Sequence, residues 1–253
     1  MMRPMLGWRY LYLTLLTAGI TVVGCGGLPA FETDATMFYR GSQTLTGSLV
    51  VGDPFNPADE TYGDTIPIQA SAGQILMVGM ESSDVDPYLE VLNSQGEIIA
   101  FNDDAGPDVH AFLAVQLPEA GTYTIRATTF DPQATGDYQL SYSLGDVEWE
   151  TQLTGSLTEG DAQHPDDQTW MDEYPISGKA RQTLLVKLAS AEFDAFVQVV
   201  NAQGDVIGQD DDQGGGSDAL LAIYLEQSGD YTIRVNAYED PALGSYTLSY
   251  QLR

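Results

Sequence analysis

The sequence predicts an all-β protein: two tandem antiparallel β-sandwich domains of jelly-roll-like type. Three observations predict this fold. Short segments alternate apolar and polar residues, turn residues recur about every 8–12 positions, and a long internal repeat covers most of the chain. No segment of helix length has an apolar period of 3.6 residues, which argues against helical layers.

The internal repeat appears without a gap when the sequence is shifted by 108 residues. Residues 45–49, LTGSL, recur at 153–157, and the YTIR segment at 123–126 recurs at 231–234. Roughly four positions in ten are identical between residues 45 and 142 and their counterparts. A repeat of this length is a whole domain rather than one turn of a solenoid.

Each repeat contains segments of strand length bounded by turn residues. Tyr88–Leu92 and Phe196–Val200 are rich in apolar residues, and each is followed by an Asn-x-Gln-Gly turn that begins at Asn93 or Asn201. Glycine in such a turn supplies the positive φ that a tight hairpin requires.

The N-terminal segment has the three parts of an export signal. Arg3 and Arg9 form a positive region, and Leu11–Val23 is a mostly apolar run too short for a comfortable membrane span. Val22 to Cys25 then resembles the lipobox of bacterial lipoproteins, in which the cysteine is acylated and becomes the new N-terminus. We therefore expect Cys25, the single cysteine, to carry the lipid anchor.

These features divide the chain into four parts: a signal peptide (1–24), a lipidated N-terminus and tether (25–42), a first sandwich (43–146) and a second sandwich (147–253). We expect the mature protein to be attached to the membrane in the cell envelope. Gly26 is not aspartate, so the usual inner-membrane retention signal is missing, which favours the outer membrane in a Gram-negative host.

The charge balance is strongly acidic, with 37 acids against 9 bases and a formal net charge of -28. Loss of Arg3 and Arg9 with the signal segment makes the mature chain more acidic still. Such a field repels nucleic acids, so we expect no nucleic-acid partner. Hydrophobic residues make up 43% of the chain, which is enough for a folded core.

Several short patterns recur in the same order in both repeats. They are an Asp-x-aromatic-aliphatic segment at 86–89 and 194–197, an acidic turn at 102–104 and 210–212, and Gly-x-Tyr at 121–123, 136–138, 229–231 and 244–246. In this order each copy resembles the bacterial pre-peptidase C-terminal domain, which is akin to the collagen-binding domains of bacterial collagenases. The resemblance covers residues 43–253 and implies a β-sandwich used for binding, solubility or surface display. That family commonly follows a peptidase domain, and we expect none before the pair here.

The residue types that catalysis requires are sparse, so we expect no enzymatic activity. The two histidines, His110 and His164, are not equivalent in the repeats, and we expect both in surface loops. Gly214–Gly216 follows an acidic run and leads into a strand, so it is interpreted as a turn rather than a phosphate-binding loop.

Clusters of acidic residues are the main group of potential metal ligands in the sequence. Aspartates at matching positions of both repeats form a candidate Ca²⁺ site assembled from several loops: Asp86, Asp103, Asp104, Asp194, Asp210, Asp211 and Asp212. Ca²⁺ prefers six to eight oxygen ligands, which carboxylates supply. A solvated acidic face is the alternative, and the sequence leaves both open.

Aromatic and basic residues give further expectations. Six tyrosines in alternating segments are expected in the core or at its edge: Tyr123, Tyr138, Tyr142, Tyr231, Tyr246 and Tyr250. Trp149 and Trp170 are the candidates for exposed contact, and Arg126 and Arg234 are each expected to pair with a carboxylate.

Taken together, these features predict a non-catalytic, lipid-anchored binding or display protein of the cell envelope, with Ca²⁺ as a candidate stabilising ion. Its expected ligand is a protein or a polysaccharide. One alternative is an accessory subunit that docks onto a secreted peptidase or envelope complex. A glycan hydrolase built on paired carboxylates is a weaker alternative.

Overall fold

The computed structural model describes residues 42–103, 110–165, 168–238 and 242–253. The predicted signal segment, Cys25 and Asp104 lie outside these ranges. All regular structure in the described ranges is β-strand, arranged in antiparallel sheets, so the predicted all-β sandwich fold is confirmed. These ranges contain no helix long and apolar enough to cross a membrane.

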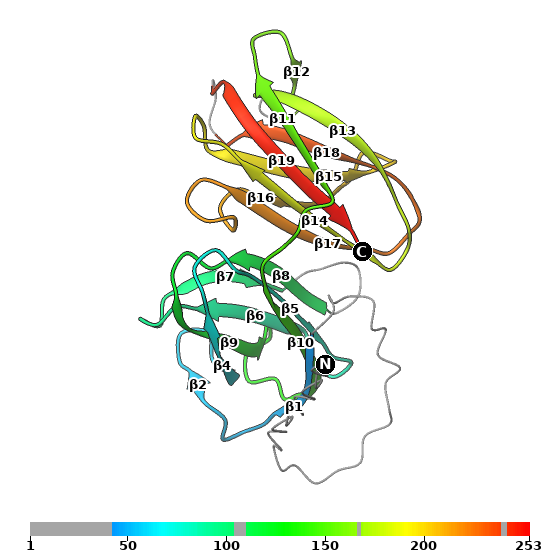
Figure 1. Ribbon diagram of the computed structural model, residues 1–253. Coiled ribbons are helices and arrows are strands. Elements are labelled where there is room, and N and C mark those ends of the chain that lie inside the picture. The colour runs from blue at the N-terminus through cyan, green and yellow to red at the C-terminus, as the bar shows by residue number, and fades with distance from the viewer. Residues whose placement is uncertain (1–41, 104–109, 166–167, 239–241) are drawn as a thin grey trace, which may run out of the picture. The chain divides into compact units, whose positions relative to one another are not determined.

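The first half of the described chain forms a sandwich of two four-stranded sheets, coloured blue to green in Figure 1. The sheet orders are β1-β10-β5-β8 and β4-β9-β6-β7, and β2 and β3 form a separate short hairpin. The strands are β1 (Gln43–Leu49), β2 (Phe55–Asn56), β3 (Thr61–Tyr62), β4 (Asp64–Ala70), β5 (Ile75–Glu81), β6 (Pro87–Leu92), β7 (Ile98–Asn102), β8 (His110–Gln116), β9 (Gly121–Thr129) and β10 (Gly136–Gly145).

The second half repeats this arrangement, coloured green to red in Figure 1. Its sheets have the orders β11-β19-β14-β17 and β12-β13-β18-β15-β16. The strands are β11 (Thr151–Leu157), β12 (Ala162–Gln163), β13 (Trp170–Gly178), β14 (Gln182–Ala189), β15 (Ala195–Asn201), β16 (Val206–Asp210), β17 (Ala219–Leu225), β18 (Gly229–Ala237) and β19 (Gly244–Leu252).

The alternation of side chains along each strand decides which residues enter the core. Leu89 and Val91 of β6 are fully buried and belong to the first core cluster, as do Ile125 and Ala127 of β9. Because successive side chains of a strand point to opposite faces, the residues between them lie on the outer face of the same sheet. The second sandwich has an equivalent core cluster that includes Val197 and Ile233.

The repeated LTGSL motif contains a glycine because a tyrosine ring lies directly over it. Gly47 of β1 pairs with Tyr138 of β10, and Gly155 of β11 pairs with Tyr246 of β19. A Cβ atom built on either glycine would approach the tyrosine to 2.2 Å. The ring thus covers the backbone of the edge strand, and the hydroxyl of Tyr138 donates to Asp64 Oδ2 at 2.7 Å.

Four of the six tyrosines expected in the core are buried, namely Tyr123, Tyr138, Tyr231 and Tyr246, and the other two are partly buried against it. Trp149 departs from the expectation of an exposed contact. It packs, partly buried, on a third apolar cluster formed by Ile75, Met77, Phe112, Ala114, Leu185 and Leu220. Removing indole surface from water explains this placement.

Substitution of Gly47 by alanine tests the glycine–tyrosine contact. We expect Gly47→Ala to lower the free energy of unfolding by about 1–3 kcal/mol, because the new methyl group displaces the Tyr138 ring. Gly145→Ala in β10 of the same sheet is the control, since no atom lies within 4 Å of its added Cβ. Urea unfolding midpoints measure both, and equal losses would refute the explanation.

Candidate functional site

The acidic loop between β16 and β17 gathers three of the predicted metal ligands. Asp210, Asp211 and Asp212 each offer a carboxylate oxygen, and these oxygens lie within 4.8 Å of one another. Among the described residues, this is the group of three acids or histidines close enough to share an ion. Three carboxylates supply only part of the six to eight oxygens that Ca²⁺ takes, so the remainder would come from backbone carbonyls and water.

Asp210 has a structural role in that loop. Its Oδ2 accepts hydrogen bonds from the backbone N–H groups of Gln213, at 3.1 Å, and Leu220, at 2.7 Å. Burial raises the pKa of Asp210 to about 7, and the neighbouring charges of Asp212 and Asp211 add to the rise. The pKa of Asp211 is also raised, by burial and then by Asp212 and Asp194.

The first repeat performs the same task with a neutral side chain. Asn102 occupies the position equivalent to Asp210, and its Oδ1 accepts from the N–H of Phe112 at 3.3 Å, which matches the Asp210–Leu220 bond. The bond to the following strand therefore does not require a charge at this position. At this position the first repeat has a neutral amide, and the second has a carboxyl group that titrates.

The seven aspartates predicted as ligands are thus brought together in part. Asp194 lies close enough to Asp211 for its charge to raise the pKa of Asp211. Asp86 and Asp103 belong to the first sandwich, where no cluster of three is found in the described residues.

The expectation that both histidines are surface loop residues is wrong for His164. This side chain is only 3% exposed, and its Nε2 lies 2.7 Å from Oε1 of buried Gln198. His164 follows β12 directly, and its ring lies against the side chain of Gln198 in β15. The repeat does not predict this burial, because Asn56 stands at the equivalent position of the first repeat.

In the first sandwich the equivalent region holds a buried ion pair instead. Arg126 of β9 donates to Glu90 of β6 at 2.8 Å, and both side chains are at least nine-tenths buried. The guanidinium also donates to Thr61 Oγ1 at 2.8 Å and contacts Asp59 at 3.4 Å. These contacts fasten the β2–β3 hairpin onto the outer face of the sheet.

Arg234, the equivalent arginine of the second repeat, contacts Glu173 of the neighbouring strand at 3.0 Å. The expectation that both arginines pair with carboxylates is confirmed. Because the position of Glu90 is taken by Gln198 in the second repeat, Arg234 turns to a different partner.

The outer face of each of these two sheets also carries a group of aromatic and acidic side chains that are half-buried or exposed. Tyr88 is two residues from Glu90 and therefore shares the outer face. Its ring stacks on that of Phe101 in β7, with centroids 6.0 Å apart and planes inclined by 12°. In the second repeat the ring of Phe196 meets that of Tyr238 edge-on at 6.3 Å.

In each repeat a backbone hydrogen bond places one aspartate and one further aromatic residue beside this group. The N–H of Phe130 donates to the carbonyl of Asp86, and that of Tyr238 donates to the carbonyl of Asp194, both at 2.9 Å. Each bond continues the antiparallel ladder, so the aspartate and the aromatic residue lie two positions from Tyr88 or Phe196 on the same face. Phe130 and Tyr238 are more than half exposed.

We use the name aromatic–acid face for the equivalent group in each repeat. The group consists of Asp86, Tyr88 and Phe130 in the first repeat, and of Asp194, Phe196 and Tyr238 in the second. All three positions keep their residue class in both repeats. The sequence pattern predicts these aspartates as metal ligands and does not single out the exposed aromatic residues. Equivalence across the repeat was the signal that could have found them. Trp170, expected in a loop, instead begins β13 and is half-buried.

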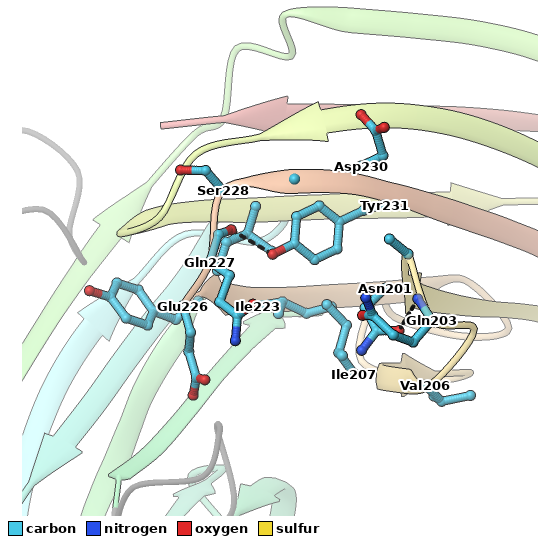
Figure 2. Close-up of a pocket in the computed structure, with 14 residues that line it drawn as sticks. Asn201, Gln203, Val206, Ile207, Ile223, Glu226, Gln227, Ser228, Asp230 and Tyr231 are labelled. Carbon is cyan, nitrogen blue, oxygen red and sulfur yellow. Dashed lines mark hydrogen bonds between the residues drawn. The ribbon is translucent and has the colours of Figure 1, made fainter.

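A pocket of about 400 Å³ opens at one end of the second sandwich, between the β15–β16 and β17–β18 turns (Figure 2). Its polar groups are largely engaged in holding those turns. The hydroxyl of Tyr231 donates to the carbonyl of Gln227 at 2.6 Å, and the carboxylate of Asp230 accepts from Ser177 at 2.8 Å. No histidine, cysteine or lysine lines it.

Comparison with known proteins adds little. No family model matches the chain, and no curated protein matches it. Among solved structures, the PBSX exported protein XepA aligns over 83% of this chain and 86% of its own, with 10% identity. The TM-score is 0.30, which is too low to support any argument about fold or function.

Replacement of Asp210 by asparagine tests the cost of its buried charge. A carboxyl whose pKa is about 7 when folded and near 3.8 when unfolded keeps its proton longer in the folded state. The folded state therefore loses stability as the pH rises from about 4 to 7, and the loss persists above pH 7. We expect Asp210→Asn to remove this loss, with a gain on the order of 3 kcal/mol at pH 8 and little change near pH 4.

Chemical unfolding at pH 4.5 and pH 8 measures this difference. An amide is a suitable replacement, because Asn102 makes the equivalent bond to the following strand in the first repeat. Asp205→Asn, at an exposed turn position, is the control for the charge change alone. A variant as pH-dependent as the wild type would contradict the assignment.

Proposed function

We propose that the chain is a non-catalytic, lipid-anchored binding protein of the bacterial cell envelope, built from two domains similar to the pre-peptidase C-terminal domain. The observation that carries this proposal is the aromatic–acid face. Exposed rings cost solvation free energy, and a folded chain seldom keeps them at equivalent positions on two surfaces without a contact to make. Here Phe130 and Tyr238 are retained as aromatic residues and remain exposed.

The chemistry of the described residues supports binding over catalysis. Hydrolysis by a nucleophile or a metal requires a base or an open coordination position near a cleft. Buried His164 already contacts Gln198, and the pocket of the second sandwich is lined by groups that hold its turns. A flat face with rings and carboxylates suits recognition of a partner chain.

In this proposal the lipid anchor attaches the protein to the membrane, and the aromatic–acid face binds the partner. Two acyl chains on Cys25 would hold the protein at the membrane, because each buried methylene contributes about 0.8 kcal/mol. The tether of residues 25–42 then separates the sandwiches from the bilayer, and the acidic surface keeps them away from anionic headgroups.

The anchor and the face are tested together with Cys25→Ser. We expect labelled palmitate to enter the wild type and not the variant. Added back to isolated envelopes, Cys25→Ser should be retained, and further change of Phe130 and Tyr238 to alanine should reduce retention several-fold. Labelling of both proteins would refute the lipoprotein proposal. Equal retention on envelopes with and without the two aromatic rings would refute the binding face.

Calcium is the proposed stabilising ion, held by the acidic loop at Asp210–Asp212. An ion that binds only the folded state at a hundredfold excess over Kd adds about 2.7 kcal/mol. We expect the thermal midpoint of the purified lipoprotein in detergent to rise in millimolar Ca²⁺ relative to EDTA. Mg²⁺ should have little effect, because it tolerates fewer protein ligands.

The rise should disappear in Asp211→Asn combined with Asp212→Asn. The control is Glu97→Gln with Asp205→Asn, which removes the same charge at exposed turn positions of both repeats. If calcium stabilises both double variants equally, or the wild type not at all, the acids form a solvated face.

A further inference from the structure

The aromatic–acid face combines two features that attract the same kind of ligand. The faces of aromatic rings carry negative potential and attract ammonium and guanidinium groups within about 6 Å. Asp86 and Asp194 stand beside Phe130 and Tyr238 through the backbone bonds that join them. An aromatic ring next to a carboxylate is therefore a site for a cationic group.

The two arginines on these outer faces contact other carboxylates. Of the bases in the described ranges, Arg126 and Arg234 are the two that lie on these outer faces. Arg126 contacts Glu90 and Asp59, and Arg234 contacts Glu173. Both are thus held further along the strands than the ring pairs.

Arg126 also shows how such a face accommodates a guanidinium. The group is enclosed by two carboxylates and the Thr61 hydroxyl, at distances of 2.8–3.4 Å. Charge-assisted hydrogen bonds of this kind are about twice as strong as neutral ones. A basic side chain from a partner would find similar groups around the exposed rings, with Asp103 near Tyr88 and Asp211 near Asp194.

We propose that the aromatic–acid face binds a basic polypeptide segment, whose Lys or Arg side chains lie against Tyr88 and Phe130 beside Asp86, and against Phe196 and Tyr238 beside Asp194. This inference rests on the proposed binding function and names its ligand class. A polypeptide fits better than a small cation, because the rings lie on an open sheet face rather than in an enclosed cavity. The excess of 37 acids over 9 bases would steer such a segment toward the protein.

The probe is a synthetic peptide of alternating Lys and Gly, with its Glu–Gly counterpart and a neutral glucan oligosaccharide as comparisons. Affinity for the full chain in detergent is measured by calorimetry at roughly 150 mM salt, where long-range attraction is screened. We expect the Lys peptide to bind and the other two probes not to bind.

Two matched pairs of variants separate the face from the net charge. Phe130→Ala with Tyr238→Ala leaves the charge unchanged and should weaken Lys-peptide binding about tenfold. Ile98→Ala with Val206→Ala, which are exposed apolar residues at equivalent positions, should leave it unchanged. Asp86→Asn with Asp194→Asn should weaken binding more than Glu97→Gln with Asp205→Asn, although both remove two charges. Urea midpoints confirm that each variant is folded.

The outcomes distinguish the ligand class from the binding function. Equal affinity of all variants for the Lys peptide would mean that net charge alone attracts it, and would overturn the inference. Ring-dependent binding of the neutral glucan in place of the peptide would also overturn it, while leaving the proposed binding function standing. Ring-independent retention on envelopes, with no probe bound, would remove both.

Discussion

The burial of one face of each sheet is the constraint on which the remaining features depend. Leu89 and Val91 must enter the core of the first sandwich, and the two-residue period of a strand then forces Tyr88 and Glu90 outward. A shift of one residue would exchange core and surface along the whole strand. The positions of the ion pair and of the exposed rings therefore follow from the apolar packing rather than from any interaction of their own.

The two repeats cover part of that outer face by different chemistry. The first uses a buried charge pair, Arg126 with Glu90, and the second uses a neutral contact between His164 and Gln198. A buried ion pair pays a large desolvation cost that its attraction only roughly offsets, so exchange for neutral groups is energetically feasible. The copies differ at this position, where Glu90 is matched by Gln198, whereas the glycine–tyrosine contact is the same in both.

The acidic loop shows the same principle at a single position. Asn102 and Asp210 both hold the strand that follows, by accepting a backbone N–H. Only the aspartate adds a group whose pKa is raised toward neutrality by burial and by neighbouring acids. Such a carboxyl is costly to the fold, and a cation placed beside it would offset that cost.

The sequence by itself determined the all-β sandwich fold, the buried tyrosines and the pairing of both arginines, because each follows from local period and composition. Its predictions of domain limits, lipid anchor and calcium stay predictions. Only the tertiary structure decided that His164 is buried, that Trp149 packs on apolar side chains, and that Phe130 lies beside Asp86 in the first sandwich as Tyr238 lies beside Asp194 in the second. These facts depend on which strands become neighbours and which loops fold over a sheet, and neither is encoded in the alternation of a single strand.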